Sequence, residues 1–224
     1  MSQTISVPPP GRQSVLLSNV DWKTYTRLLR LFAERPGIRL TYDDGELEIM
    51  SPTLEHDDEG SLLGDFVFML TLELGLPLKR GGSVTMRQKK KQKGIESDEC
   101  FWITNAHRMA AKKRLDLRSD PPPDLAIEID VTSSSLDRMA IYAALKVPEL
   151  WRLEGNVLTF HVLQPDGTYQ SVERSLAFPL LTPGDLLLFI QQAREAGDEN
   201  VVMRRFRDWI RLRAAGAEGS SGEQ

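Results

Sequence analysis

PPPDLAIEIDVTSSSLDRMAIY, residues 121–142, predicts a buried strand that runs directly into a helix. Successive side chains of a strand point to opposite faces, so the two faces of this strand can be read from the sequence. One face is aliphatic and the other is acidic: Leu125, Ile127 and Ile129 against Asp124, Glu128 and Asp130.

The acidic face has two interpretations. An alternating strand is usually half-exposed, with core on one side and water on the other. Here, however, three carboxylates share one line, and the helix that follows predicts cover over a face of the sheet. Covered acids without a basic side chain nearby are costly unless a cation neutralises them. Carboxylate ligands favour Mg²⁺ or Mn²⁺ over zinc.

A further acid, Asp98 in the stretch ESDECFWI (96–103), begins the preceding predicted strand. Asp98 at the start of that strand and Glu128 on the next would give two carboxylates from adjacent strands, a pair that can hold one metal ion. Such a metal polarises a phosphoryl oxygen and lowers the pKa of bound water, so that hydroxide attacks a phosphodiester near neutral pH.

The composition bounds the possible functions. The chain has 224 residues, of which 41% are hydrophobic, so one domain with a substantial core is expected. Its net charge of −4 means that any contact with a polyanion must come from a local basic patch. One cysteine excludes an internal disulfide framework, and no run of eighteen apolar residues occurs. We therefore expect a cytoplasmic protein with no membrane partner.

The remaining patterns predict an α/β fold with a mixed central sheet and a helix on each side. Residues 1–14 read as a flexible arm, 15–213 as a single domain and 214–224 as a flexible tail. In the first part of the domain we expect a helix capped by Asp21, a hairpin that turns at Asp44-Gly45 and a helix that ends at Gly75. Strands at 83–88 and 98–104 should follow, joined by a loop at 89–97. The last part should contain a helix capped by Ser135, two or three strands across 149–172, a helix capped by Thr182 and a closing helix.

Four segments together resemble the Uma-two family of the PD-(D/E)XK restriction-endonuclease-like superfamily. They are YDDGELEIMSPTLEHD (42–57), SDECFWI (97–103), the passage from Pro121 to Leu153, and AFPLL (177–181). The resemblance runs from about Val20 to Trp209. It implies a restriction-endonuclease-like fold, flanked by an N-terminal helix and hairpin and by C-terminal helices, with acidic metal ligands on two central strands.

The resemblance also assigns roles to individual residues. Asp98 matches the first aspartate of the family and Glu128 the acid of the next strand. Asp124 belongs to a second PD pair and either assists at the metal or supports the start of the strand. A lysine should lie two residues after the glutamate, but Asp130 stands there.

Many members supply a lysine from the following helix instead, four residues before a tyrosine. This chain has Arg138 at that position. Arginine stays protonated and cannot accept a proton from water, although it can hold the scissile phosphate. The alternative for Arg138 is an exposed helix residue that pairs with Asp137 or Asp130.

Two other groups are candidates. In the superfamily, an acid on the second helix often completes the metal site, and Glu59 is the candidate for that role here. His56 on the same helix could orient substrate. The alternative for acids at this place is that they complement the helix dipole.

A basic set lies between two predicted strands and could contact a phosphate backbone, or could simply be a solvated hairpin. It comprises Arg87, Lys89, Lys90, Lys91 and Lys93.

The sequence thus favours a DNA endonuclease that depends on Mg²⁺ or Mn²⁺. The rival is a catalytically inactive protein of the same fold that binds nucleic acid or another partner, which the missing lysine favours. A structural or oligomer-forming domain is a third reading, and a homodimer stays open.

Overall fold

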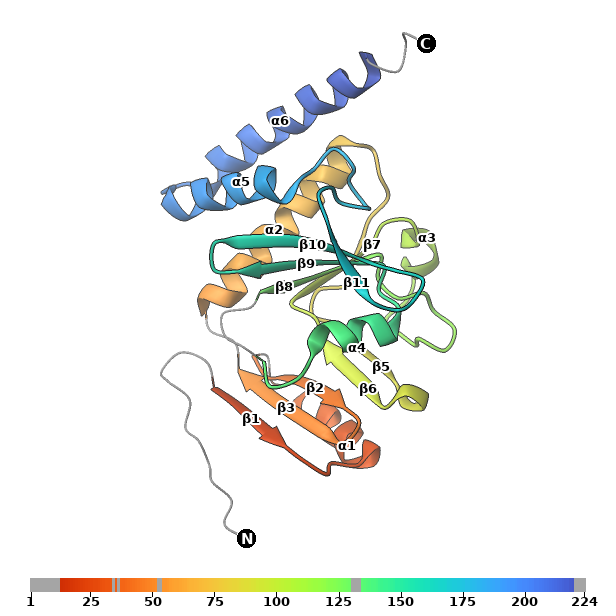
Figure 1. Ribbon diagram of the computed structural model, residues 1–224. Helices are drawn as coiled ribbons and strands as arrows, with labels where there is room; N and C mark the ends of the chain where they lie inside the picture. The colour runs from red at the N-terminus through yellow and green to blue at the C-terminus, as the bar shows by residue number, and fades with distance from the viewer. Residues whose placement is uncertain (1–12, 34, 36, 52–53, 130–133, 220–224) are drawn as a thin grey trace.

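The computed structural model describes residues 13–33, 35, 37–51, 54–129 and 134–219, without the side chains of 13, 54–57 and 217–219 (Figure 1). Its strands are β1 (Gln13–Leu17), β2 (Arg39–Asp43), β3 (Glu46–Ser51), β4 (Lys79–Arg80), β5 (Thr85–Gln88), β6 (Lys93–Glu96), β7 (Glu99–Trp102), β8 (Leu125–Ile129), β9 (Glu149–Glu154), β10 (Val157–Leu163) and β11 (Tyr169–Val172). Its helices are α1 (Trp22–Phe32), α2 (Leu54–Glu73), the 3₁₀ turn η1 (Lys89–Lys91), α3 (Ala106–Met109), α4 (Arg138–Leu145), α5 (Pro183–Glu195) and α6 (Glu199–Gly219).

The strands form two sheets where the sequence predicts one. The smaller sheet has the order β1-β3-β2-β6-β5 and is antiparallel throughout. The larger has the order β11-β10-β9-β8-β7-β4, in which β8 and β9 are parallel and the other pairs antiparallel. This mixed α/β architecture is consistent with a restriction-endonuclease-like fold.

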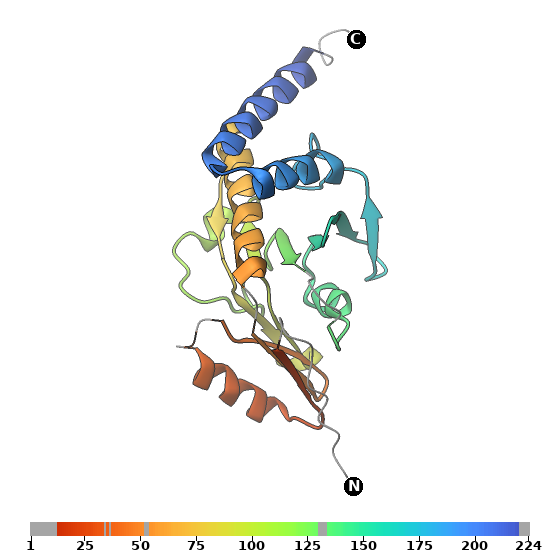
Figure 2. The same ribbon diagram turned by 90° about the vertical axis from the view of Figure 1, so that its left-hand side faces the viewer.

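Strand β8 is covered on both faces, so the half-exposed interpretation is wrong for residues 125–129. All five of its residues are buried. Its aliphatic face packs in the cluster that contains Leu63 and Phe66 of α2, whereas Ala126 packs with Tyr142 of α4. Figure 2 shows α2 and α4 on opposite sides of the larger sheet. Acids on the second face of β8 therefore lie under α4.

Several local signals hold in the structure. Asp21 accepts the Thr24 N–H at 2.7 Å at the start of α1. Asp44 and Gly45 take φ values of 44° and 97° in the β2–β3 turn, which favours glycine at the second position. Thr182 and Asp185 form a reciprocal capping box on α5.

Other elements differ from the sequence prediction. The segment 93–96 is strand β6 rather than loop, and its Gly94 lies under the Tyr25 ring, where a Cβ would overlap the ring carbons at 2.7–2.8 Å. Asp137, not Ser135, caps α4 by accepting the Ala140 N–H at 3.0 Å. β1 was not predicted, and α6 continues to Gly219, past the expected start of the tail.

Within the described ranges, no helix combines the length and the apolar character needed to cross a bilayer.

Candidate active site

Asp98 and Glu128 lie at the same end of adjacent strands. β7 and β8 are antiparallel with Glu99 opposite Ile127, which sets Asp98, just before β7, opposite Glu128. The Oδ2 atom of Asp98 accepts the Ile129 N–H at 2.7 Å. Both acids are buried, with 5% and 6% of their surface exposed. The two acids are therefore largely shielded from solvent by the fold.

Glu128 is neutralised by Arg138 from the first turn of α4. The Nη2 atom of Arg138 lies 2.6 Å from Oε2 of Glu128, and the Tyr142 hydroxyl donates to Oε1. Arg138 also reaches the smaller sheet, where it donates to Oγ1 of Thr41 at 3.1 Å and to the carbonyl oxygen of Glu96 at 3.3 Å. Only 9% of Arg138 is exposed, so its interpretation as an exposed helix residue is wrong.

The charges around Arg138 fix its protonation state. Burial alone would lower its pKa, but the carboxylates of Glu128 and Glu48 and the nearby Tyr142 raise it, and the net shift is upward. Burial, and then the charge of Glu128, raise the pKa of Tyr142 far above its ordinary value. Tyr142 therefore stays protonated and donates to Glu128, while Arg138 stays cationic.

Asp98 has an arginine of its own. It forms an ion pair with Arg39 of β2, in the smaller sheet. A Cβ built on Gly60 of α2 would lie 3.9 Å from the Cβ of Asp98, so the Cβ of this acid packs close to α2, whereas the Glu128 carboxylate contacts Tyr142 of α4. Each acid thus has an arginine counter-ion of its own.

Glu48 is an acid of this region that the sequence reasoning missed. Only 2% of it is exposed, and it accepts the Ser134 hydroxyl at 2.7 Å and the Ser135 N–H at 3.2 Å. It lies opposite Thr41 in the β2–β3 ladder, and Thr41 is the residue to which Arg138 donates. Its alternation with Leu47 and Ile49 is typical of an exposed strand face, but the segment that leads into α4 contacts it in the structure.

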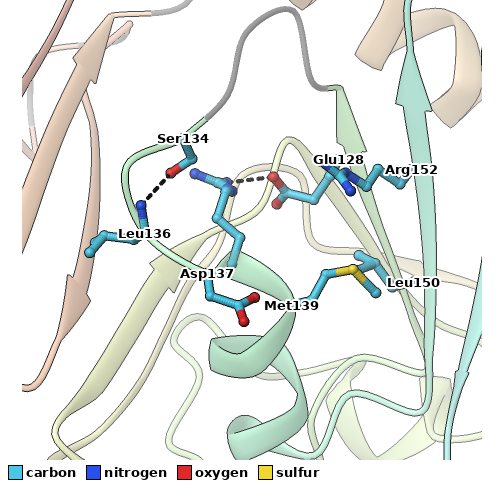
Figure 3. Close-up of a pocket in the computed structure, with 8 residues that line it drawn as sticks. Glu128, Ser134, Leu136, Asp137, Met139, Leu150 and Arg152 are labelled. Atoms are coloured by element: carbon cyan, nitrogen blue, oxygen red, sulfur yellow. Dashed lines mark hydrogen bonds and ion pairs between the residues drawn. The ribbon is translucent and has the colours of Figure 1, made fainter. Parts of the chain in front are cut away.

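A hollow of about 190 Å³ adjoins Glu128 (Figure 3). Arg152 of β9 is the register partner of Glu128 and lies at the same wall of the hollow. The lining residues are Glu128, Ser134, Leu136, Asp137, Arg138, Met139, Leu150 and Arg152. This space gives a ligand group a route to Glu128 and Arg138.

Asp124 supports the start of β8. Its carboxylate accepts the N–H groups of Ile103 at 2.7 Å and of Asn105 at 3.1 Å, and the Asn105 side-chain amide at 2.9 Å. These donors tie it to the turn after β7, at the opposite end of β8 from Glu128. Of the two roles left open for Asp124, the geometry favours support of the strand.

Glu59, the acid proposed on the second helix, is bound elsewhere than at the pair. Glu59 accepts from Nε of Arg194 at 2.9 Å, and the same arginine donates to the carbonyl oxygen of Gly155 at 2.9 Å, so Glu59 is held at the β9–β10 turn. The side chain of His56 and the whole of Asp130 lie outside the described residues.

The basic set is only partly available to a ligand. Arg87, Lys89 and Lys90 are exposed. Lys91 donates to the Ala144 carbonyl, and burial together with the charge of Lys146 lowers its pKa. Lys93 pairs with Asp43. Three of the five basic side chains therefore face water beside η1.

The donor chemistry at the acid pair suits a hard divalent cation, because both side chains are carboxylates on neighbouring strands. In the present arrangement, guanidinium groups balance both carboxylates. Among the side chains that the structure describes, no three Asp, Glu, His or Cys residues are grouped so that they could hold a metal. A metal would thus need the arginines to give way.

The model of the family Uma2, described as "putative restriction endonuclease", matches residues 22–191, which is most of the chain and includes both acids and Arg138. No curated protein matches the sequence.

Proposed function

Because the chain belongs to the Uma2 family of restriction-endonuclease-like proteins, we propose that it hydrolyses phosphodiester bonds in DNA. The observation that carries this proposal is the buried pair Asp98 and Glu128 at one end of adjacent strands, with Arg138 and a hollow beside Glu128.

Asp98 and Glu128 would hold Mg²⁺ or Mn²⁺, and the bound ion would polarise a phosphoryl oxygen and lower the pKa of water. The protein's own groups do the rest. Tyr142 orients the Glu128 carboxylate through its hydroxyl. Arg138, once released from Glu128, presents a permanently charged guanidinium to the phosphate, where it stabilises developing negative charge.

The exposed part of the basic set would place the DNA. Arg87, Lys89 and Lys90 can contact phosphates along the strand without reading its sequence. Their contribution should weaken as salt concentration rises, because binding through phosphate contacts releases counter-ions.

The test is nicking of supercoiled plasmid by the full chain in Mg²⁺ and in Mn²⁺. We expect relaxed product with the wild type and none with Glu128→Gln or Asp98→Asn. Absence of cleavage of plasmid and of single-stranded DNA in both metals would contradict the proposal.

A second candidate is a DNA-binding protein without cleavage activity. The arginine pairs favour it, because they already neutralise the acids that a metal would need. Plasmid binding that Glu128→Gln leaves unchanged, with no cleavage in either metal, would select this function.

A further inference from the structure

Arg138 is the cation that balances a buried acid. Its guanidinium lies against Glu128 of the larger sheet and also donates to Thr41, the ladder partner of the buried Glu48 in the smaller sheet. Glu128 accepts from Tyr142 as well, so both of its oxygens are engaged when Arg138 is in place. A divalent ion that binds Glu128 through Oε2 would therefore compete with this guanidinium for the same oxygen.

The contacts of Arg138 also join the two sheets. Through Thr41 and the Glu96 carbonyl it holds β2 and β6, and through Glu128 it holds β8. The Arg39–Asp98 pair makes the same connection at the second acid, from β2 to the residue before β7. Displacing an arginine would thus release a link between the sheets as well as a carboxylate.

One feature indicates that Arg138 is not completely satisfied where it lies. Its Nε–H group is buried and has no hydrogen-bond partner in the described structure. A buried donor without an acceptor costs free energy, which makes this state easier to leave than a fully bonded one. The hollow lined by Arg138 gives the side chain space toward which it can swing.

We propose that Arg138 is an internal counter-ion that competes with a divalent metal for Glu128, so that metal binding and release of the link between the sheets are one coupled event. This inference rests on the proposed function for its metal. It goes further by assigning Arg138 the control of metal affinity. The apparent metal affinity equals the intrinsic affinity multiplied by the fraction of protein in which the competing group has left, so removal of the competitor should tighten metal binding.

The experiment is calorimetric titration of the full chain with Mn²⁺ alone, without DNA. We expect Arg138→Met to bind Mn²⁺ about tenfold or more tightly than the wild type, since a tenth or less of the wild type would have Arg138 released. The gain should vanish in the double variant Arg138→Met/Glu128→Gln. Arg211→Gln is the matched control: it removes the positive charge of the exposed Arg211 on α6, which pairs with Glu73 of α2, and should leave the affinity at the wild-type value.

Equal Mn²⁺ affinity of Arg138→Met and wild type would overturn the inference, as would a gain that survives Glu128→Gln. If Arg138→Met does not fold, Arg138→Lys replaces it, because lysine keeps the charge but loses the planar set of donors. We then expect a smaller gain in Mn²⁺ affinity of about threefold, since lysine engages Glu128 through fewer hydrogen bonds; no gain overturns the inference. Because DNA is absent, a chain that shows the gain and never nicks DNA contradicts only the proposed function.

Discussion

Glu128 and Glu149 are two buried glutamates on neighbouring strands whose partners differ in kind. Glu149 of β9 is fully buried and accepts from neutral donors: Nε1 of Trp151 at 2.8 Å and the main-chain N–H groups of Leu176 and Ala177 at 3.0 and 2.8 Å. Glu128 of β8 is balanced instead by the side chain of Arg138.

The difference separates a structural acid from an exchangeable one. Main-chain donors cannot leave Glu149 without unfolding the segment that carries them, so this carboxylate fixes the loop before α5. The guanidinium of Arg138, at the end of a long side chain, can rotate away from Glu128 while α4 stays helical. The same residue type, equally buried, is therefore available to a ligand in one place and committed to the fold in the other.

The largest expected effect on stability is that of Arg138→Met. It leaves the Glu128 carboxylate buried without its cation, and breaking such a pair costs about 3–5 kcal/mol in the free energy of unfolding. Urea denaturation of the metal-free protein measures this, and added Mn²⁺ should recover part of the loss. A loss below about 1 kcal/mol, as is typical of exposed pairs, would mean that Arg138 does not stabilise the buried charge of Glu128 in the folded protein.

Glu149→Gln should destabilise the protein by a smaller amount. Glutamine offers one acceptor oxygen where the carboxylate offers two, so at least one of three buried N–H groups loses its partner, at about 1–3 kcal/mol. Mn²⁺ should not recover this loss, and that contrast with Arg138→Met is the informative result. Recovery of Glu149→Gln by Mn²⁺ would remove the distinction between the two acids.

The pH dependence of stability gives a finer contrast. Burial raises the pKa of Glu149 above 4.5, and its hydrogen bonds offset this only in part. Because the folded-state pKa lies above the unfolded one, the folded state binds the proton more tightly, and stability falls as pH rises from about 4.5 through the raised value. Unfolding free energies measured from pH 4 to 8 should show a shallower fall in Glu149→Gln than in the wild type. An identical profile would contradict this assignment.

The smallest effect is expected at an exposed pair. Arg211 contacts Glu73 at 2.6 Å, and its side chain is 59% exposed. Arg211→Gln should leave the denaturation midpoint unchanged within error, because solvent and salt screen such pairs. A loss as large as that of Arg138→Met would mean that burial does not set the strength of these ion pairs.

The part of the site that lies on consecutive elements could be predicted from the sequence. Two adjacent strands were predicted from the spacing of Asp98 and Glu128 and from the alternation through Ile127 and Ile129, and the structure contains them as β7 and β8. The hairpin was predicted from the turn residues Asp44-Gly45, and it joins β2 to β3.

What the sequence could not supply is the packing of the smaller sheet on α4 and on the segment before it. Glu48 meets Ser134 across 86 positions and Arg138 meets Thr41 across 97, and no local periodicity reports contacts of that range. Arg138 was expected at a phosphate or in water, and the structure places it against Glu128 because the smaller sheet closes over α4. The second sheet itself was missed because β6 carries Gly94 within a lysine-rich segment that is typical of a loop.

The most direct test of the account is the nicking rate of Glu128→Gln beside that of Glu149→Gln, with supercoiled plasmid in Mn²⁺ and equal amounts of folded protein. Both variants remove one buried negative charge by the same chemical change. The account predicts no nicking by Glu128→Gln and a wild-type rate for Glu149→Gln. Equal rates in the two variants, whether both active or both inactive, would contradict the claim that Glu128 is the acid of the reaction.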